Sequence, residues 1–410
     1  MNAKQFSAYD IFIIIILAIL QFSVVLDFMV IAPLGAQLMR VLEINPKQFG
    51  AVVSAYGISA GVSAFATAGF TDKFDRKHLL LFFYGGFIIA TFMCALAPNY
   101  QLLLIARIFT GMFGGVMSSI SFAIVADTFK FEVRGKVMGF IQMAFSTSQI
   151  LGIPIGLYLA HKFNWHFPFY MIVTVSIIVF FVVLFKVRPI NEHLKYRLEQ
   201  NAIKRLLNIL SNSNYLKAFL TTFLLAMGFI VMPFLSTFFV NNLGIQEVQL
   251  PLIFLASGLV TIISGPITGS LSDKVGKYKI FVIGSLFAMI MLILLTNLNA
   301  VNMWLLIIVN TIFVVFATAR MISGSAIMSA VPELNDRGAF MSINSAIQQM
   351  STGIATMLGG FLLVESKNGG FANFEVLGYI SAVFMIICAV LTFFINRFAM
   401  DKIELQNIKQ

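Results

Sequence analysis

The sequence predicts an all-α polytopic membrane protein in which twelve transmembrane helices form two pseudo-symmetric six-helix bundles. Three observations lead to this fold class. Hydrophobic residues make up 59% of the 410-residue chain and charged residues only 11%, whereas about 25% of the residues in soluble globular proteins are charged. The apolar segments have the length of about 20 residues that a helix needs to cross a bilayer. A short polar sequence occurs once in each half of the chain.

The recurring polar sequence lies at residues 68–77 and again at residues 269–279. Its two aspartates, Asp72 and Asp273, are 201 residues apart. An acid followed by bases is costly beside lipid, so each copy must lie at the water interface between two spanning helices. A duplicated membrane bundle is the simplest explanation of this spacing.

In the first half, the apolar segments predict spans at residues 10–38, 46–70, 78–97, 100–127, 135–160 and 165–187. The first segment continues past Asp27 to Leu38 without a small-residue cleavage site, so we expect it to stay as an anchor. Residues 68–77 separate the second span from the third, and Arg134 lies where the fifth begins.

In the second half, the spans are predicted at residues 215–241, 248–271, 279–298, 301–330, 338–364 and 372–398. Residues 269–279 separate the eighth span from the ninth. Arg337 lies where the eleventh span begins, 203 residues after Arg134, so the repeat holds across more than one loop. With six spans in each half, both halves enter the membrane from the same side. We therefore expect parallel repeats with a central cavity between them.

One long polar connector joins the two halves. Its leucines and isoleucines recur at roughly helical spacing with bases between them, which predicts an amphipathic helix on the inner membrane face. A regulatory or partner-binding role is the alternative to a solvated linker. The predicted domains are an N-terminal six-helix bundle at residues 1–187, a cytoplasmic linker at residues 188–214, and a C-terminal six-helix bundle with a short cytoplasmic tail at residues 215–410.

The formal net charge of +10 is an orientation signal. If the N-terminus is cytoplasmic, 21 of the 27 Lys and Arg residues fall on inner segments, four on outer segments and two within spans. The positive-inside rule then predicts that both termini are cytoplasmic. We expect a monomer in the inner membrane of a bacterium. It should contact the lipid bilayer and should not bind nucleic acid.

The sequence shows no pattern for a metal, a cofactor or catalysis. The four histidines lie at loops or span ends without ligand-like spacing, and both cysteines fall inside apolar spans, where a disulfide or metal site is not expected. A phosphate-binding glycine-rich loop ending in Lys-Ser or Lys-Thr is missing, which argues against direct use of ATP. We expect no metal, no cofactor and no enzymatic activity.

The polar sequences resemble the signature of the major facilitator superfamily of secondary transporters, Gly-x-Leu-Ala-Asp-Arg-x-Gly-Arg-Lys. In the first copy Asp72, Arg76 and Lys77 match, whereas Ala68 and Asp75 stand where the signature has glycines. The second copy keeps Gly269, Leu271, Asp273, Gly276 and Lys277. The resemblance covers essentially the whole chain and implies the major facilitator fold.

Further motifs resemble those of the bacterial drug/proton antiporters with twelve spans. Leu26-Asp27, followed by Pro33, is similar to a Leu-Asp motif in their first span. Arg107, with Gly111 and Gly115 in the fourth span, resembles the second motif of the superfamily as a whole. The helix-packing positions that the resemblance implies are Gly111 and Gly115 in the fourth span, and Gly139, Gly152, Pro154 and Gly156 in the Gly/Pro-rich antiporter motif of the fifth. Pro154 stands one place later than in the usual Gly-Pro pair.

In this family, charged residues at the inner face form a latch that closes the inner side while the outside is open. The resemblance implies such a role for Asp72, Arg76, Lys77, Asp127, Arg134, Asp273, Lys277 and Arg337. Asp72 lies where a carboxylate can receive N–H groups at the start of a facing helix. Arg76 can pair with Asp127, which ends the fourth span on the same face. A plain turn with orienting charges is the alternative.

Three ionisable residues fall well inside the predicted spans: Asp27, Arg107 and Arg320. Each costs roughly 2.5 to 3.5 kcal/mol on insertion scales, so each should face the cavity or a partner. The predicted depths of Asp27 and Arg107 differ by about one helical turn, so the two side chains can approach. Asp27 can carry the coupling proton, bind a cationic substrate or serve as a static partner of Arg107. The sequence leaves these alternatives open.

Two buried arginines and one buried aspartate leave a formal charge of +1, which favours an anionic, zwitterionic or carbonyl-bearing substrate. Alternatively, Arg320 bonds to amide side chains of Gln142, Asn310, Asn344, Gln348 or Gln349. The predicted cavity-lining residues are Tyr56, Gln142, Gln149, Asn310, Arg320, Asn344 and Gln348. Contacts between helices explain such amides as often as ligand binding does.

The sequence therefore predicts a secondary transporter that works by alternating access, with proton-coupled efflux of small organic molecules as the favoured function. Its expected partners are a small organic substrate and protons, the protons being handled by Asp27 and Arg107. The alternative is an importer or uniporter for an organic anion that Arg107 and Arg320 clamp.

Overall fold

The computed structural model describes residues 6–67, 74–191, 194, 208–333, 336–366 and 370–408. Among these residues, eleven helices are long and apolar enough to cross a membrane. The remaining predicted span is the helix α16 (Arg337–Leu362), which is long enough but carries polar side chains such as Asn344 and Gln348 along its length. The all-helical, twelve-span prediction is confirmed.

In the first half, the helices follow the predicted spans closely. They are α1 (Ala8–Val30), α2 (Gly35–Val41), α3 (Pro46–Thr67), α4 (Arg76–Leu96), α5 (Tyr100–Gly114), α6 (Met117–Thr128), α7 (Phe131–Thr147), the π-helical turn η2 (Ser148–Gly152), α8 (Ile153–Lys162) and α9 (Phe167–Lys186). Asp75, which stands where the family signature has a glycine, caps α4: its side chain accepts hydrogen bonds from the N–H groups of Lys77 and His78. This cap satisfies N–H groups that the first helical turn leaves unpaired.

The second half repeats this pattern. Its helices are α11 (Ser213–Met227), η4 (Met232–Phe234), α12 (Leu235–Asn241), η5 (Glu247–Gln249), α13 (Leu250–Val275), α14 (Lys277–Thr296), α15 (Met303–Ala330), α16 and α17 (Phe374–Ile408). Most of the predicted linker at residues 188–214 lies outside the described residues.

The first and seventh predicted spans are not continuous helices in the structure. The first span is interrupted between α1 and α2, at Pro33, and the seventh between α11 and α12, at Pro233. Proline lacks the N–H group of the helical hydrogen bond and clashes with the preceding turn, so it breaks both helices. The two breaks lie 200 residues apart, in keeping with the repeat.

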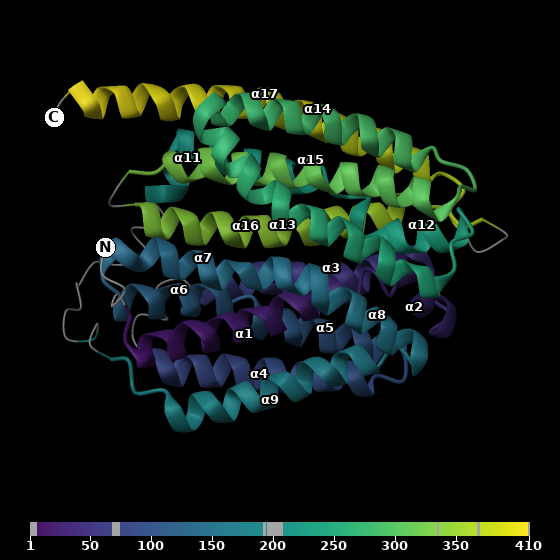
Figure 1. The fold of residues 1–410 in the computed structure, drawn as a ribbon, viewed down its shortest axis with the longest axis horizontal. Coiled ribbons are helices and arrows are strands. Elements are labelled where there is room, and N and C mark those ends of the chain that lie inside the picture. The colour runs from purple at the N-terminus through teal and green to yellow at the C-terminus, as the bar shows by residue number, and fades with distance from the viewer. Residues whose placement is uncertain are drawn as a thin grey trace.

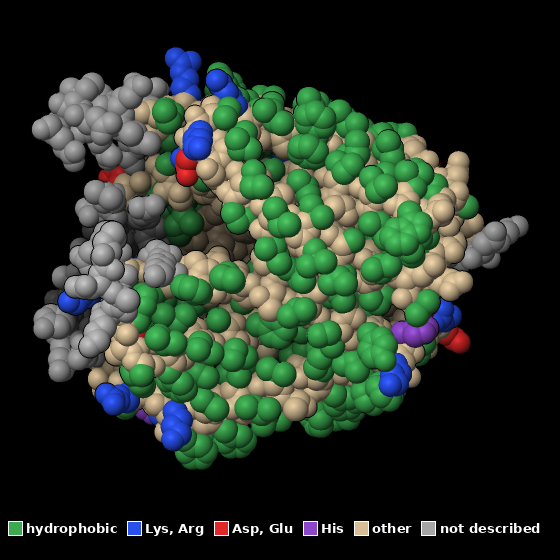
Figure 2. All heavy atoms as spheres, in the orientation of Figure 1, with side chains coloured by type: hydrophobic (Ala, Val, Ile, Leu, Met, Phe, Trp, Pro, Cys, Tyr) green, Lys and Arg blue, Asp and Glu red, His purple; other side chains and the backbone are tan. Residues whose placement is uncertain are grey.

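The two halves lie one above the other in Figure 1, and both chain ends lie at the same end of the bundle. α3 and α16 pack against each other between the halves, and so do α8 and α13. Figure 2 shows a hollow between the halves at the end where the termini lie. At the opposite end, α2 contacts α12. The molecule is therefore open at one end of the bundle and closed at the other.

Glycines lie at several of the closest contacts in the seam between α3 and α16. A Cβ atom at Gly57 would lie 2.9 Å from the carbonyl oxygen of Gln349 and 3.0 Å from Cα of Gly353. Nearer the closed end, a Cβ atom at Gly360 would lie 2.7 Å from the carbonyl oxygen of Pro46. The neighbours in each case are backbone atoms, which a side chain cannot displace without separating the helices. Glycine thus allows the two halves to approach closely.

Candidate functional site

The first candidate site is a buried ion pair between α1 and α5. Arg107 Nη1 lies 2.7 Å from Asp27 Oδ2, and both side chains are fully buried. The same nitrogen donates to the backbone oxygen of Asp27 at 3.3 Å, and the Thr91 hydroxyl donates to Asp27 Oδ1 at 3.4 Å. Arg107 Nε and Nη2 have no hydrogen-bond partner among the described residues. One nitrogen of the guanidinium therefore holds the carboxylate, instead of the two that a bidentate pair uses.

Tyr56 belongs to this site. The guanidinium of Arg107 lies over its ring, 4.7 Å from the ring centroid, and the ring of Phe28 packs 5.2 Å from it. Tyr56 was predicted to line the cavity, but in this structure its side chain is buried against Arg107. A Cβ atom at Gly114 would lie 2.6 Å from the Tyr56 hydroxyl, so a glycine at this position leaves room for the Tyr56 side chain.

Glycines of the predicted packing motifs surround the ion pair. Gly111 and Gly115 face α3 so closely that a Cβ atom at Gly115 would lie 2.5 Å from Cα of Ala60. In the fifth span, a Cβ atom at Gly152 would lie 2.6 Å from Leu26 Cδ1, and one at Gly156 would lie 3.0 Å from Val30 Cγ2. These two glycines hold the fifth span against the part of α1 that carries Asp27.

Two members of the Gly/Pro-rich motif behave differently. A Cβ atom at Gly139 would meet nothing within 4 Å, so the prediction that this glycine packs against a neighbouring helix is not met here. Pro154 lies in the first turn of α8, directly after the π-helical turn. The helix runs from α7 through η2 into α8 without a break, so the missing N–H group of Pro154 is accommodated by the wider π-helical turn that precedes it.

The predicted cavity amides divide into two groups. Asn310 Nδ2 donates to Ser257 Oγ at 2.9 Å, and Asn344 Oδ1 accepts from Thr222 Oγ1 at 2.6 Å. Both are buried and join helices of the second half to each other. Gln142 is exposed and Gln149 and Gln348 are half-buried, so these three side chains stay candidates for lining the hollow.

Arg320 lies inside the second half. It is fully buried, with its guanidinium 5.3 Å from the ring centroid of Phe229 and 6.0 Å from that of Phe281. None of its three side-chain nitrogens has a hydrogen-bond partner among the described residues. The alternative that Arg320 bonds to one of the amides is therefore wrong in this structure.

Arg107 and Arg320 do not form a joint clamp. Arg107 contacts Asp27 and Tyr56, which belong to the first half. The aromatic rings that Arg320 contacts belong to the second half. Each guanidinium is thus buried within its own bundle, and the clamp that the sequence alternative needs is not formed here.

The predicted latch residues make contacts within one half. Arg76 Nε lies 2.8 Å from Asp127 Oδ2, the pair that the sequence predicts, and this pair joins α4 to the end of α6. Lys77 Nζ donates to the backbone oxygen of Leu184 at 2.8 Å, and Arg134 Nε to that of Phe129 at 2.9 Å.

In the second half, Lys277 Nζ at the start of α14 lies 3.1 Å from Asp273 Oδ1 near the end of α13, and both side chains are exposed. Asp72 and the side chain of Arg337 lie outside the described residues. None of these described ion pairs and hydrogen bonds joins the two halves, in keeping with the hollow at this end of the bundle (Figure 2).

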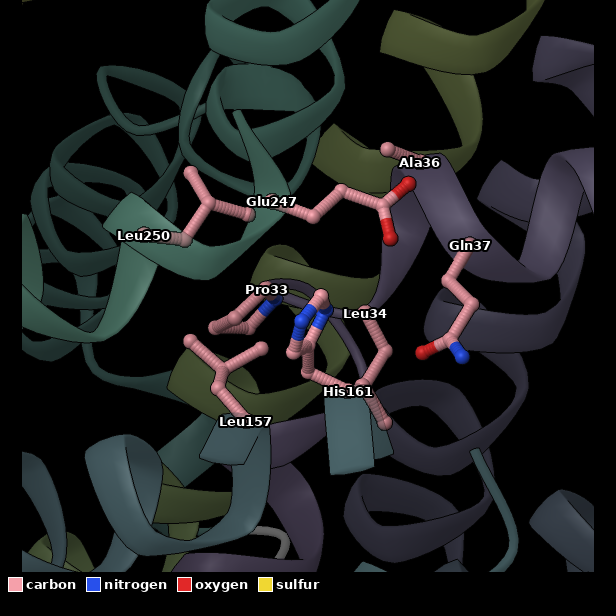
Figure 3. Close-up of a pocket in the computed structure, with 8 residues that line it drawn as sticks. All are labelled: Pro33, Leu34, Ala36, Gln37, Leu157, His161, Glu247 and Leu250. Atoms are coloured by element: carbon pink, nitrogen blue, oxygen red, sulfur yellow. The ribbon is translucent and has the colours of Figure 1, made fainter. Parts of the chain in front are cut away.

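An ion pair at the closed end joins the halves, and the sequence analysis missed it. Arg40 Nη1 of α2 lies 2.6 Å from Glu247 Oε1 of η5. Figure 3 shows the Glu247 side chain reaching toward Ala36 and Gln37 of the first half. The Ser236 hydroxyl of α12 also donates across the two halves, to the backbone oxygen of Ala32 at 2.7 Å. The only sequence signal was that both charged residues fall on predicted outer segments.

Comparisons with known proteins agree with this architecture. The family model described as Major Facilitator Superfamily matches residues 17–231 and 218–405. The chain is 26% identical over 367 residues to an uncharacterized MFS-type transporter, YceJ, of Bacillus subtilis (strain 168), covering 88% of this chain and 90% of that protein. It is 28% identical over 152 residues to Multidrug resistance protein 3 of the same organism, covering 37% of this chain and 30% of that protein.

Solved structures share the fold. A D-xylose-proton symporter superposes with a TM-score of 0.77 at 16% identity, covering 94% of this chain and 97% of that chain. A bacterial homolog of the human lysosomal transporter Spinster, in an inward-facing and occupied conformation, superposes with a TM-score of 0.71 at 14% identity, covering 96% of this chain and 98% of that chain. At these identities the likeness concerns the fold.

Proposed function

The chain belongs to the Major Facilitator Superfamily, and from this premise we propose that it exports small organic molecules in exchange for protons by alternating access. The family consists of multi-pass membrane transporters that handle small substrates, and not of enzymes. Proton coupling, the outward direction, the inner-membrane location and the cytoplasmic position of both termini are parts of the proposal.

The buried ion pair between Asp27 and Arg107 carries the proposal. Asp27 is the only buried acid among the described residues. A buried carboxylate that is paired with a single guanidinium can give up this ion pair and bind a proton instead. Protonation removes the charge that Arg107 Nη1 binds. The other two nitrogens of Arg107 have no hydrogen-bond partner of good geometry among the described residues. After protonation of Asp27, the guanidinium is therefore held mainly by the Asp27 backbone oxygen and the Tyr56 ring, and we expect it to reorient more easily.

The position of the ion pair links the proton to the movement of the halves. Asp27 lies six residues before Pro33, the break that separates α1 from the closing helix α2. Gly152 and Gly156 pack the fifth span against the same part of α1, and the fifth span also packs against α13 of the other half. A change at Asp27 therefore acts on a helix that reaches both the outer closure and the interface.

The direction of transport rests on two observations. The fifth span keeps glycines at two close contacts with α1, in the segment that resembles the antiporter motif. One relative is named Multidrug resistance protein 3, which favours export. The hollow lies at the end of the termini (Figure 2), and the distribution of basic residues favours this end as the cytoplasmic one.

Proteoliposomes with an enclosed pH-sensitive dye test the proposal. We expect that adding a substrate to vesicles with a proton gradient produces proton movement, and that collapsing the gradient stops accumulation of that substrate. Empty vesicles are the control. A substrate that moves without any proton would contradict proton coupling and favour the uniporter alternative.

The ion pair between Arg40 and Glu247 is expected to hold the outer end closed. Replacing Glu247 by Gln should raise the fraction of molecules open at that end by at most about fivefold, because exposed ion pairs contribute about 0.2 to 1 kcal/mol. The measurement is the rate at which a membrane-impermeant maleimide modifies an Ala36→Cys variant, Ala36 being buried in this structure. The two natural cysteines are buried and give little background.

A charge exchange provides the control for this ion pair. The double variant Arg40→Glu with Glu247→Arg restores opposite charges and should return the labelling rate to that of the parent. If the exchanged pair labels as fast as the single variants, the ion pair does not hold the closure.

A further inference from the structure

Arg320 has no carboxylate partner among the residues that the structure describes. Its three side-chain nitrogens make no hydrogen bond of good geometry among the described residues, although the side chain is fully buried. The thiol of Cys388 in α17 lies beside the guanidinium, but a thiol is only a weak acceptor and does not replace a carboxylate. Asp27 is the only buried acid among those residues, and Arg107 already binds it. An unpaired guanidinium at this depth is costly unless a negative group reaches it. The chain offers no second buried carboxylate for this purpose among its described residues.

The sequence repeat shows where such a group would belong. Asp27-Phe28 in the first span and Gly228-Phe229 in the seventh are 201 residues apart, the spacing of the two polar sequences. A Cβ atom at Gly228 would lie 2.8 Å from Arg320 Nη1 and 2.9 Å from Nη2. The guanidinium therefore faces the position at which the first half carries its carboxylate, and the second half has no side chain there.

The segment that covers Arg320 is not helical. α11 ends at Met227, and the chain continues as turns until η4 begins at Met232. Phe229 lies in this break, half-buried, with its ring over the guanidinium. In transporters, interrupted spans form the walls of substrate sites near the middle of the membrane. The break and the unpaired charge are independent observations that mark the same place.

We infer that Arg320 binds the carboxylate of an anionic substrate, so that the ligand does for Arg320 what Asp27 does for Arg107. The inference rests on the proposed transport function and names its substrate class. Two nitrogens of a guanidinium match the two oxygens of a carboxylate. The rings of Phe229 and Phe281 supply apolar walls beside that charge. The structure thus assigns an organic acid with an apolar body, and the ring of Phe229 must turn aside to admit it.

Thermal unfolding of the purified full-length protein tests this assignment with benzoate as the probe and benzamide as its neutral match, at one ionic strength. Benzoate should raise the Tm of the unsubstituted protein and benzamide should not. Arg320→Gln should weaken the apparent benzoate affinity by roughly thirtyfold or more, as expected when a buried charge loses its partner.

A pair of variants at Gly228 makes the test independent of whether Arg320→Gln folds. Gly228 has φ −62° and ψ −7°, which other residues adopt without strain. Gly228→Asp supplies an internal carboxylate, so it should raise the Tm without ligand and remove the benzoate effect. Gly228→Ala adds only a Cβ atom 2.8 Å from Arg320 Nη1, so the end of the flexible Arg320 side chain must shift slightly to admit it. Because alanine brings no carboxylate, this variant should keep the benzoate effect.

Two outcomes overturn the inference. One is that benzoate does not raise the Tm of the unsubstituted protein more than benzamide does. The other is that the benzoate effect survives in Gly228→Asp, which would leave Arg320 as a purely structural residue. Failure of the proposed function is distinguishable from failure of this inference. If proteoliposomes show no substrate-dependent proton movement but benzoate still binds, proton coupling is rejected and the Arg320 site is retained. Proton-coupled transport that persists while benzoate has no effect on the Tm keeps the proposed function and removes this site.

Discussion

Replacing Asp27 by asparagine is expected to abolish substrate-dependent proton movement. Asparagine keeps the size of the side chain but cannot take up and release a proton, so the buried site loses its exchangeable charge. The change also leaves Arg107 without its carboxylate partner, and breaking a buried pair from one side costs about 3 to 5 kcal/mol. Dye-loaded proteoliposomes measure the first effect, and the Tm of the purified protein measures the second.

A double variant separates the proton carrier from the static partner. Asp27→Asn combined with Arg107→Gln removes both charges, so it should regain much of the lost stability because no lone charge stays buried. If Asp27 carries the proton, the double variant still moves no protons with substrate. If the double variant couples protons like the unsubstituted protein, Asp27 is only a structural partner of Arg107, and the proposed mechanism is wrong.

The second large effect is expected from Gly360→Ala. The new Cβ atom would lie 2.7 Å from the carbonyl oxygen of Pro46 and 3.2 Å from Cα of Gly50. These atoms are backbone, so α3 and α16 must separate near the closed end of the bundle. Overpacking costs about 1 to 3 kcal/mol, which corresponds to a shift of roughly five- to 150-fold toward molecules open at that end. Labelling of the Ala36→Cys variant should accelerate accordingly, and transport should slow.

Gly85→Ala is the matched control for the seam. The nearest atom to its Cβ would be a ring carbon of Phe180 at 3.4 Å, an ordinary contact with a side chain. It should leave labelling and transport unchanged. Equal labelling rates in Gly360→Ala and Gly85→Ala would show that the seam does not control the outer closure.

The two ion pairs of the candidate site were predictable, because they follow from the residue types and from how deep each residue lies along its span. A charge inside an apolar span has to find a partner, and the spans that carry Asp27 and Arg107 place the two side chains at similar depth. The pairing of Arg76 with Asp127 followed in the same way from two span ends at one face. Both pairs exist in the structure.

Other site residues were not predictable from depth alone. Tyr56, Asn310 and Asn344 were expected to line the cavity, but they contact Arg107, Ser257 and Thr222 instead. A spanning helix is apolar on nearly all sides, so its sequence lacks the polar face that shows which side of a soluble helix meets water. The rotation of each helix about its axis is therefore hidden in the sequence.

The sequence by itself determined the number and order of the spans, the duplication and the family. These depend on local hydrophobicity, segment length and short motifs, which each segment carries alone. Only the tertiary structure decided that Arg40 meets Glu247, that glycines join α3 to α16, and that Arg320 stands unpaired against Gly228. Such contacts join residues from distant segments, so they depend on how rigid helices pack and on which end of the bundle is closed. The sequence of a single segment determines neither the packing nor the closed end.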